Sequence, residues 1–424
     1  MRLPDALAPM RDRRFAWYYS GRVVSTIGST MVPVALAFAV LEIDDSPSAL
    51  GLVLAAQSVP LVVFLLVGGV VSDRFSRSLV MQVSHILSAL TQGTVAALVV
   101  TGTAELWMVV GLEVLNGTAL AFTFPAMNGI VPQVVPRSHL QQANALLSFS
   151  RAGLAIIGPT VAALLVVTIG PGWALAVDSL TWVVAAAFMA RVALPPRERS
   201  ADDPSPSMLR ELREGWSAFT EHTWLWLVVL AFGFGNAIHA GAWYTLGPAR
   251  ALDTIGAAGW GYVLSAEAAG ILVTTVLMLR VRFRFPLRTG MLGVATFALP
   301  CFMLGADPEV WLLVPLAFLA GAGMEIFGIG WNTALHENID ERVLSRVSSY
   351  DALGSFVAIP VGQLTFGPLA HVFGMQRVLV VAGTVYAVIA LGTLLSRSVR
   401  DLRRDDVPVA HLARVSAPSA QPAS

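Results

Sequence analysis

Uninterrupted apolar runs of about 20 residues alternate with short polar segments along the whole chain. A helix of about 18–25 mostly apolar residues crosses the ~30 Å hydrocarbon layer of a bilayer. The runs are continuous and do not alternate apolar with polar residues as the strands of a membrane β-barrel do. The pattern predicts twelve membrane-spanning helices in two sets of six: 15–41, 47–71, 79–101, 106–130, 149–170 and 173–194, then 224–247, 258–279, 287–305, 310–335, 351–372 and 376–396.

Composition excludes most other classes of protein. Of 424 residues, 56% are hydrophobic and 13% charged, against about 45–50% and about 25% in ordinary globular chains. A formal net charge of zero argues against nucleic acid as a partner. The single cysteine, Cys301, excludes a disulfide framework, and the seven histidines show no metal-ligand spacing. Neither a nucleotide-binding motif nor a catalytic motif occurs, so we expect no metal, no cofactor and no enzymatic activity.

The distribution of arginine predicts the orientation in the membrane. All 27 basic residues are arginines, and nearly all lie in the segments that face the cytoplasm if the N-terminus is inside. The positive-inside rule therefore places both termini in the cytoplasm of a multi-pass cell-membrane protein. Arg151 is counted here with the cytoplasmic loops. The first apolar run is too long for a signal peptide and is expected to stay as a membrane helix.

The longest polar stretch divides the chain into two halves. We expect a six-helix bundle over 1–194, a cytoplasmic linker over 195–222 with a short amphipathic helix near 208–219, a second six-helix bundle over 223–400, and a disordered tail over 401–424. Segment 51–57 (GLVLAAQ) is similar to 261–267 (GYVLSAE), and Asn128 with Leu140 corresponds to Asn332 with Leu344. These matches favour a parallel repeat, although chance similarity between apolar helices is an alternative.

Segment 69–78 resembles the loop 2–3 signature of the major facilitator superfamily, G-x-x-x-D-[RK]-x-G-[RK]-[RK]. Gly69, Asp73, Arg74 and Arg77 fit, whereas Ser76 and Ser78 depart from it. The segments 140–146 and 346–351 resemble loops of the branch that contains enterobactin-exporter-like and macrolide-efflux-like permeases. Gly158-Pro159 resembles a reduced form of the superfamily's antiporter motif. The resemblance implies an all-α membrane protein of twelve helices in two six-helix bundles, which transports solutes by alternating access.

The resemblance also implies a latch at the cytoplasmic side. Asp73 is expected beside the N-terminus of the eleventh span, where a carboxylate is favoured by the helix dipole. Arg74 and Arg77 could then pair with Asp351 when that side is closed. The alternative is that these charges merely mark a cytoplasmic loop.

Ionisable residues inside spans are costly unless paired or hydrated, and they therefore indicate function. Arg22 and Glu113 are expected about 12 Å and about 10 Å from opposite membrane faces, at heights within reach of each other. Many drug exporters of the superfamily have an arginine in span 4, four residues before a glycine; here Glu113 precedes Gly117 in that way. We hypothesise a charge-swapped pair that responds to protonation. The alternatives are a static ion pair and an Arg22 side chain that extends to the membrane surface.

Further candidates lie in the second half and in the expected cavity. Glu267 is a candidate proton carrier, and Glu325 a second buried carboxylate or a gate residue. The predicted substrate cavity contains Asn116, Phe122, His239, Trp243 and Phe327, since aromatic side chains with few charges suit a lipophilic or amphiphilic solute.

These observations favour a monomeric secondary active transporter in the lipid bilayer that exports a small lipophilic or amphiphilic compound, such as a drug, macrolide-like or siderophore-like molecule, against protons. A second hypothesis is import or facilitated diffusion of a nutrient. A non-transporting receptor or assembly factor and a lipid-modifying membrane enzyme are the alternatives from other classes.

Overall fold

The computed structural model describes residues 8–136, 139–192, 216–278, 280–281, 283–339 and 341–403. Most of the predicted linker helix near 208–219, and the predicted tail beyond 403, lie outside the described residues.

The described part of the chain is helical and has twelve helices long and apolar enough to cross a membrane, which confirms the predicted number. Ten of the twelve helices begin within two residues of the predicted position, and the eleventh begins at Glu341, ten residues before the predicted 351. The fifth begins at Leu140, nine residues earlier than the expected 149, because the polar residues before Phe149 continue the helix and Asn144 faces a cavity instead of lipid.

Several spans consist of more than one helical segment. The first half contains η1 (Ala8–Arg11), α2 (Arg13–Ser29), α3 (Val32–Ile43), α4 (Pro47–Arg74), α5 (Arg77–Val100), α6 (Leu106–Val134), α7 (Leu140–Ile169) and α8 (Pro171–Met189). The second half contains α10 (Thr223–Ile238), the π-helical η3 (His239–Leu246), α11 (Gly247–Leu252), α12 (Gly256–Met278), α13 (Pro286–Ala295), α14 (Ala298–Gly305), α15 (Val310–Asn338), α16 (Glu341–Phe356), α17 (Ala358–Phe373), α18 (Met375–Gly392), η4 (Thr393–Leu395) and α19 (Arg397–Arg400).

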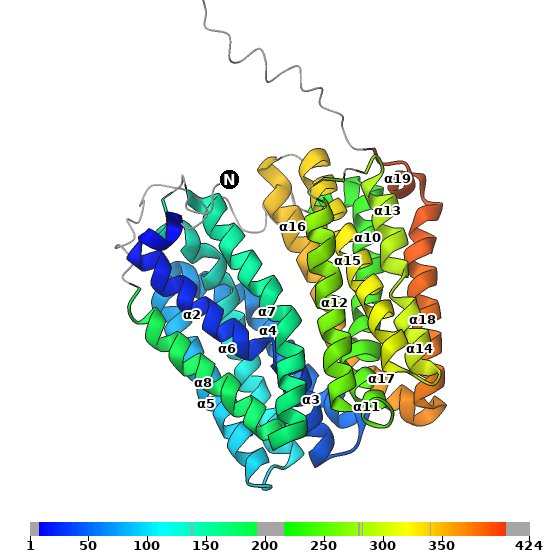
Figure 1. Ribbon diagram of the computed structural model, residues 1–424. Coiled ribbons are helices and arrows are strands. Elements are labelled where there is room, and N and C mark those ends of the chain that lie inside the picture. The colour runs from blue at the N-terminus through cyan, green and yellow to red at the C-terminus, as the bar shows by residue number, and fades with distance from the viewer. Residues whose placement is uncertain are drawn as a thin grey trace, which may run out of the picture.

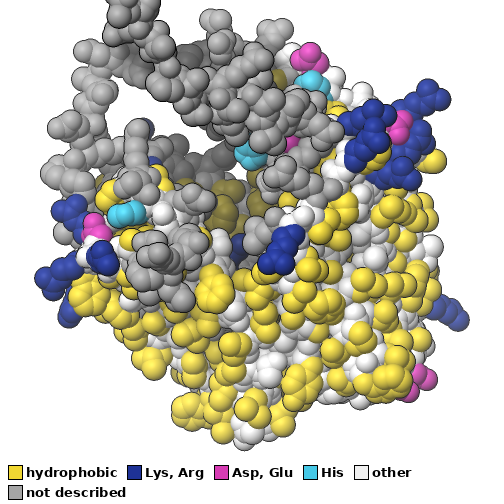
Figure 2. Space-filling model, turned by 45° about the horizontal axis from the view of Figure 1, so that its top comes forward, with side chains coloured by type: hydrophobic (Ala, Val, Ile, Leu, Met, Phe, Trp, Pro, Cys, Tyr) yellow, Lys and Arg dark blue, Asp and Glu magenta, His cyan; other side chains and the backbone are white. Residues whose placement is uncertain are grey.

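The two halves form separate bundles that meet at one end (Figure 1). They splay apart toward the side on which both ends of the described chain lie, as expected for an even number of crossings. At the opposite end α4 packs along α17 and α7 packs along α12. In Figure 2 the flank below the splayed end is mostly hydrophobic, and the dark blue arginines gather around the splayed end. This distribution fits a flank in contact with lipid.

The contacts between helices repeat from one half to the other, in agreement with the predicted repeat. Gly117 of α6 packs on the Gln57 carbonyl of α4, and Gly321 of α15 packs on the Glu267 carbonyl of α12; the two glycines are 204 positions apart. Gly170 ends α7 at φ 92°, and Gly374, also 204 positions later, ends α17 at φ 85°. Only glycine adopts this conformation without strain, so both turns depend on it.

Two repeat-related contacts also close the end where the bundles meet. Gly51 of α4 approaches the Gln363 carbonyl of α17, and its counterpart Gly261 of α12 approaches the Pro159 carbonyl of α7. Because glycine has no side chain, backbones come close enough at both points to seal the space between the halves.

Polar side chains reinforce this closure. Ser58 donates to Gln363 Oε1 at 2.5 Å, and the Thr160 and Ser265 hydroxyls are 2.7 Å apart. We call these four residues, with Gly51 and Gly261, the closed gate.

Candidate substrate cavity and its buried charges

A cavity of about 650 Å³ lies in the first half of the chain. The two halves separate toward the side that holds the chain ends, and Figure 2 shows a hollow between them there. Among the described residues, every one that lines the cavity belongs to α2–α8: Tyr18, Arg22, Val23, Thr26, Ser29, Val32, Pro33, Gln57, Leu61, Gln92, Asn116, Leu120, Thr123, Phe124, Met127, Val131, Asn144, Leu147, Ser148, Ser150, Arg151, Asp178 and Trp182.

Three helices each present one regular face to this cavity. The face of α7 contains Asn144, Leu147, Ser148 and Arg151, with the i, i+3, i+4, i+7 spacing of a single helix face. The faces of α2 and α6 follow the same rule and carry a similar mixture of polar and apolar side chains. The cavity is therefore amphiphilic and more polar than the aromatic cavity that the sequence predicts.

Glu113 is completely buried in the wall behind this cavity. Its carboxylate accepts three hydrogen bonds from amides: Gln57 Nε2 and Gln92 Nε2 at 2.9 Å each and Asn116 Nδ2 at 3.3 Å. All three amide residues line the cavity. Gly117 makes this arrangement possible, because it lets α6 approach α4 closely enough for Gln57 to reach the carboxylate.

Arg22 lines the cavity but does not pair with Glu113 in this conformation. Among the described side chains, no carboxylate lies within the 4.0 Å of a salt bridge to Arg22. Arg151 of α7, which carries the same charge, lines the same cavity. In place of the predicted pairing of Arg22 with Glu113, the carboxylate has amide donors, and Arg22 shares the cavity with a second arginine.

The position of Arg151 differs from the one predicted from the sequence. It does not lie in a cytoplasmic loop; it is within α7 and lines the cavity. The early start of α7 accounts for the difference, and the spacing from Asn144 to Arg151 was the signal that could have shown it. Gln92 was missed as well, because a single glutamine in an apolar run has no spacing signal of its own.

Asp178 of α8 is a further buried carboxylate that lines the cavity. Its Oδ2 accepts from Trp182 Nε1 at 3.3 Å, and Gly28 of α2 packs directly against it. Its other oxygen, Oδ1, has no hydrogen-bond partner within the described part of the chain.

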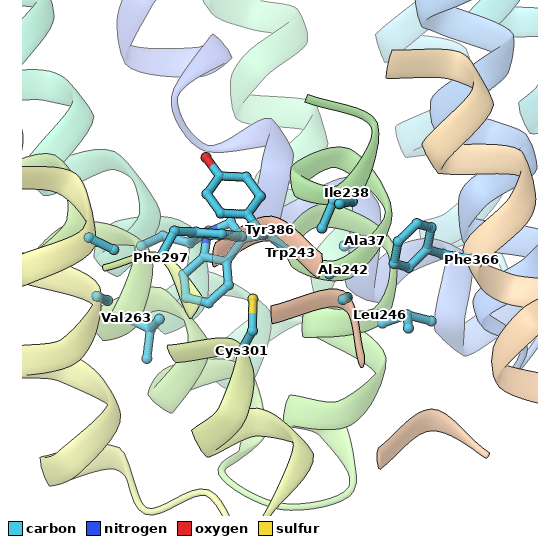
Figure 3. Close-up of a cluster of buried hydrophobic side chains, with 14 of the residues drawn as sticks. Ala37, Ile238, Ala242, Trp243, Leu246, Val263, Phe297, Cys301, Phe366 and Tyr386 are labelled. Carbon is cyan, nitrogen blue, oxygen red and sulfur yellow. The ribbon is translucent and has the colours of Figure 1, made fainter. Parts of the chain in front are cut away.

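The second half has its own cluster around Glu267. Trp243 Nε1 donates to Glu267 Oε2 at 2.8 Å, and His239 Nε2 lies 3.6 Å from Oε1. Trp243 is fully buried in the cluster that also holds Phe297, Tyr386 and Cys301 (Figure 3). The π-helical turn that contains His239 and Trp243 directs both toward α12.

The structure therefore places several predicted cavity residues elsewhere. His239 and Trp243 belong to the Glu267 cluster, and Phe327 stacks on Phe232 with ring centroids 4.1 Å apart. Phe122 is half-buried but is outside the set that lines the cavity. Of the five residues predicted for the cavity, Asn116 lines it.

Glu325 lies half-buried on α15 and accepts from Thr275 Oγ1 at 2.7 Å. Its carboxylate does not come within 4.0 Å of Arg151 among the described contacts.

The latch residues are only partly described. Gly69 and the Asp73 side chain lie outside the part of the chain that can be described. Arg74, at the end of α4, is exposed, and Arg77, at the start of α5, is half-buried. Asp351 accepts from Trp331 Nε1 at 2.9 Å in this splayed conformation, so its pairing with an arginine remains a prediction for a conformation in which the splayed end is closed.

No group of three or more metal-ligating side chains occurs within the described ranges. The fold of two six-helix bundles, with a cavity among the helices of the first, defines a membrane transporter of the major facilitator type. The chain matches the family described as transmembrane secretion effector over residues 4–419, and it belongs to that family.

Relatives and solved structures agree with this class. The chain is 24% identical to the uncharacterized MFS-type transporter YfiS of Bacillus subtilis, over 91% of this chain and 93% of that protein. It is 23% identical to macrolide efflux protein A of Streptococcus pyogenes, over 92% and 97%. The nucleoside transporter NupG has a similar fold, with a TM-score of 0.73, 13% identity, and coverage of 90% and 98%. A bacterial homologue of the lysosomal transporter Spinster, solved inward-facing and unoccupied, has a TM-score of 0.71 at 15% identity, with coverage of 96% and 100%.

Proposed function

We propose that this secondary transporter exports small amphiphilic compounds from the cytoplasm in exchange for protons. The observation that carries the proposal is the buried Glu113 carboxylate, held by three amides that line the cavity. The names of two relatives support the direction of transport: macrolide efflux protein A, and the multidrug efflux pump Tap of Mycolicibacterium fortuitum, which is 23% identical over 82% of this chain.

The site around Glu113 can accommodate the carboxyl group with and without a proton. An ionised carboxylate only accepts hydrogen bonds, whereas a protonated one also donates. Gln92 Oε1 and Asn116 Oδ1 are buried and have no hydrogen-bond partner in the part of the chain described. After rotation of one amide, either oxygen could accept from the protonated carboxyl, so proton binding exchanges one hydrogen bond for another at little cost.

A proton at Glu113 would also act on the closed gate. Gln57, which donates to the carboxylate, directly precedes Ser58, which donates to Gln363 across the two halves. Rotation or release of the Gln57 amide would disturb this turn of α4. We therefore propose that proton binding from the outside and substrate binding from the inside bias the same element, α4, between two positions.

Transport by protein reconstituted in vesicles tests this function. Vesicles preloaded with a fluorescent amphiphile are exposed to imposed pH gradients of both signs, and solute movement is followed in each case. We expect movement opposite to the proton gradient that collapses with a protonophore. Solute movement that is independent of the gradient would refute proton coupling, and proton-driven movement in the same direction as protons would refute exchange.

Glu113→Gln is the variant that addresses the carboxyl group itself. The glutamine carbonyl still accepts, and its amide can donate to Gln92 or Asn116, so we expect normal expression, loss of proton-driven transport, and residual solute exchange that no longer depends on pH. Glu105→Gln is the matched control, because Glu105 is exposed just before α6 and outside the cavity. A Glu113→Gln protein with the pH profile of the unmodified chain would exclude Glu113 as the proton carrier.

A further inference from the structure

We infer that the transported amphiphile carries an anionic group, a sulfonate, carboxylate or phosphate, which binds between Arg22 and Arg151. This inference rests on the proposed function, because it names the chemical class of solute that the same cavity would take.

The first observation is that two arginines face one cavity from two different helices. Arg22 is on α2 and Arg151 on α7, and both line the space. Arg22 is half-buried and Arg151 is exposed. Like charges that share one cavity favour a negative group between them.

The second observation is that the chain does not supply this negative group within the described residues. No carboxylate lies within 4.0 Å of either guanidinium. Glu113 accepts from its three amides, Asp178 accepts through Oδ2 from Trp182, and Glu325 accepts from Thr275. Asp178 Oδ1 has no hydrogen-bond partner among the described residues, but it too lies beyond ion-pair distance of both arginines.

The third observation is the surroundings of the two arginines. The amide of Asn144 and the hydroxyl of Ser148 line the same space and could donate further hydrogen bonds to an oxyanion. Apolar side chains on α6, including Phe124, which is 47% exposed, offer a surface for a hydrophobic body. A planar guanidinium binds sulfonate, carboxylate or phosphate through two parallel hydrogen bonds. The cavity thus matches an organic anion with an aromatic or aliphatic body.

Two fluorescent probes with the same skeleton test the inference. Anilinonaphthalene sulfonate and the neutral N-phenylnaphthylamine differ essentially in one sulfonate. Their binding to the purified protein in lipid nanodiscs is titrated by quenching of tryptophan fluorescence, with empty nanodiscs to correct for partition into lipid. We expect the sulfonate to bind more tightly than the neutral probe.

Substitutions of the arginines identify the source of the preference. A hydrogen bond to a charged group contributes about 1.5–3 kcal/mol, so Arg22→Gln or Arg151→Gln should weaken sulfonate binding by about tenfold or more. The neutral probe should change by less than about threefold. Arg22→Lys and Arg151→Lys keep the charge and should retain part of the preference. Arg284→Gln is the matched control, because Arg284 is exposed, lies over the Phe285 ring and is outside the cavity.

The outcomes separate this inference from the proposed function. Equal weakening of both probes in the glutamine variants would show that the arginines only support the fold, and it would overturn the inference. The same conclusion follows if the neutral probe is exported by a proton gradient while the sulfonate shows no arginine-dependent binding. Arginine-dependent binding of the sulfonate without export of either probe would support the anion site and overturn proton-coupled export.

Discussion

The contact between Gly117 and the backbone of α4 gives the sharpest prediction, because it links helix packing to the buried carboxylate. A Cβ atom at residue 117 would lie far inside the 3.0 Å that such atoms keep from their neighbours, against the Gln57 carbonyl oxygen and backbone. Ordinary contact begins at 3.4 Å. Gly117→Ala therefore requires α4 and α6 to separate, since neither backbone segment can rotate away as a flexible side chain would.

The free-energy cost of Gly117→Ala has two contributions. Overpacking at a tight interface costs about 1–3 kcal/mol. Separation of the helices also moves Gln57 Nε2 away from Glu113, and loss of one hydrogen bond to a charged group costs about 1.5–3 kcal/mol. We expect Gly117→Ala to lower the stability by about 3–5 kcal/mol and to abolish proton-dependent transport even in the protein that still folds.

The control lies on the same helix. A Cβ at Gly111 would meet nothing within 4 Å, so Gly111→Ala should be neutral or stabilise α6 by up to about 1 kcal/mol through helix propensity. Thermal unfolding in detergent, together with vesicle transport, measures both variants. Equal unfolding temperatures and equal transport for the two alanine variants would refute the close approach of α4 and α6.

Further predictions concern the closed gate and the second half. Thr160→Cys combined with Ser265→Cys should form a disulfide on oxidation, and this disulfide should stop transport until a reductant is added. Neither single substitution should have this effect. The buried Cys301 should stay unreactive in all three variants, which thiol labelling would show. Continued transport by the fully cross-linked protein would mean that this end does not open. Glu267→Leu should lower the stability by about 1–3 kcal/mol, because Trp243 Nε1 loses its buried acceptor. Glu267→Gln keeps an acceptor oxygen and should lower the stability much less. Identical unfolding temperatures of the two variants would contradict this account.

The number of helices and their approximate positions follow from the sequence alone, because a membrane span must be long and apolar. The repeat was visible too, in the match of Gly51 with Gly261. The boundary of α7 could not be predicted in the same way. Its first two turns mix polar with apolar residues, and Asn144 faces the cavity, so the hydropathy signal that marks a lipid-facing helix is weak there.

The candidate site was predictable only in part. The unusual burial of Glu113 follows from its position in an apolar run, and Asn116 follows from the helical spacing. The partners of Glu113 could not be foreseen, because Gln57 and Gln92 come from two other helices and reach it only through tertiary packing. For Trp243 and Phe327, the sequence shows a large aromatic residue in a span but not the direction in which its side chain points. In the structure, both side chains are buried in the core of the second bundle.

Because the cavity is confined to the first bundle, that bundle would determine which solutes bind, and the second bundle would serve to close the cavity. Among the described residues, those that would contact a solute all come from α2–α8, and the second bundle supplies the surface against which α4 and α7 close. Natural variation in which solutes are transported would then accumulate in the first 192 residues. A chimaera that joins this portion to the second bundle of a relative should inherit the solute range of the first portion.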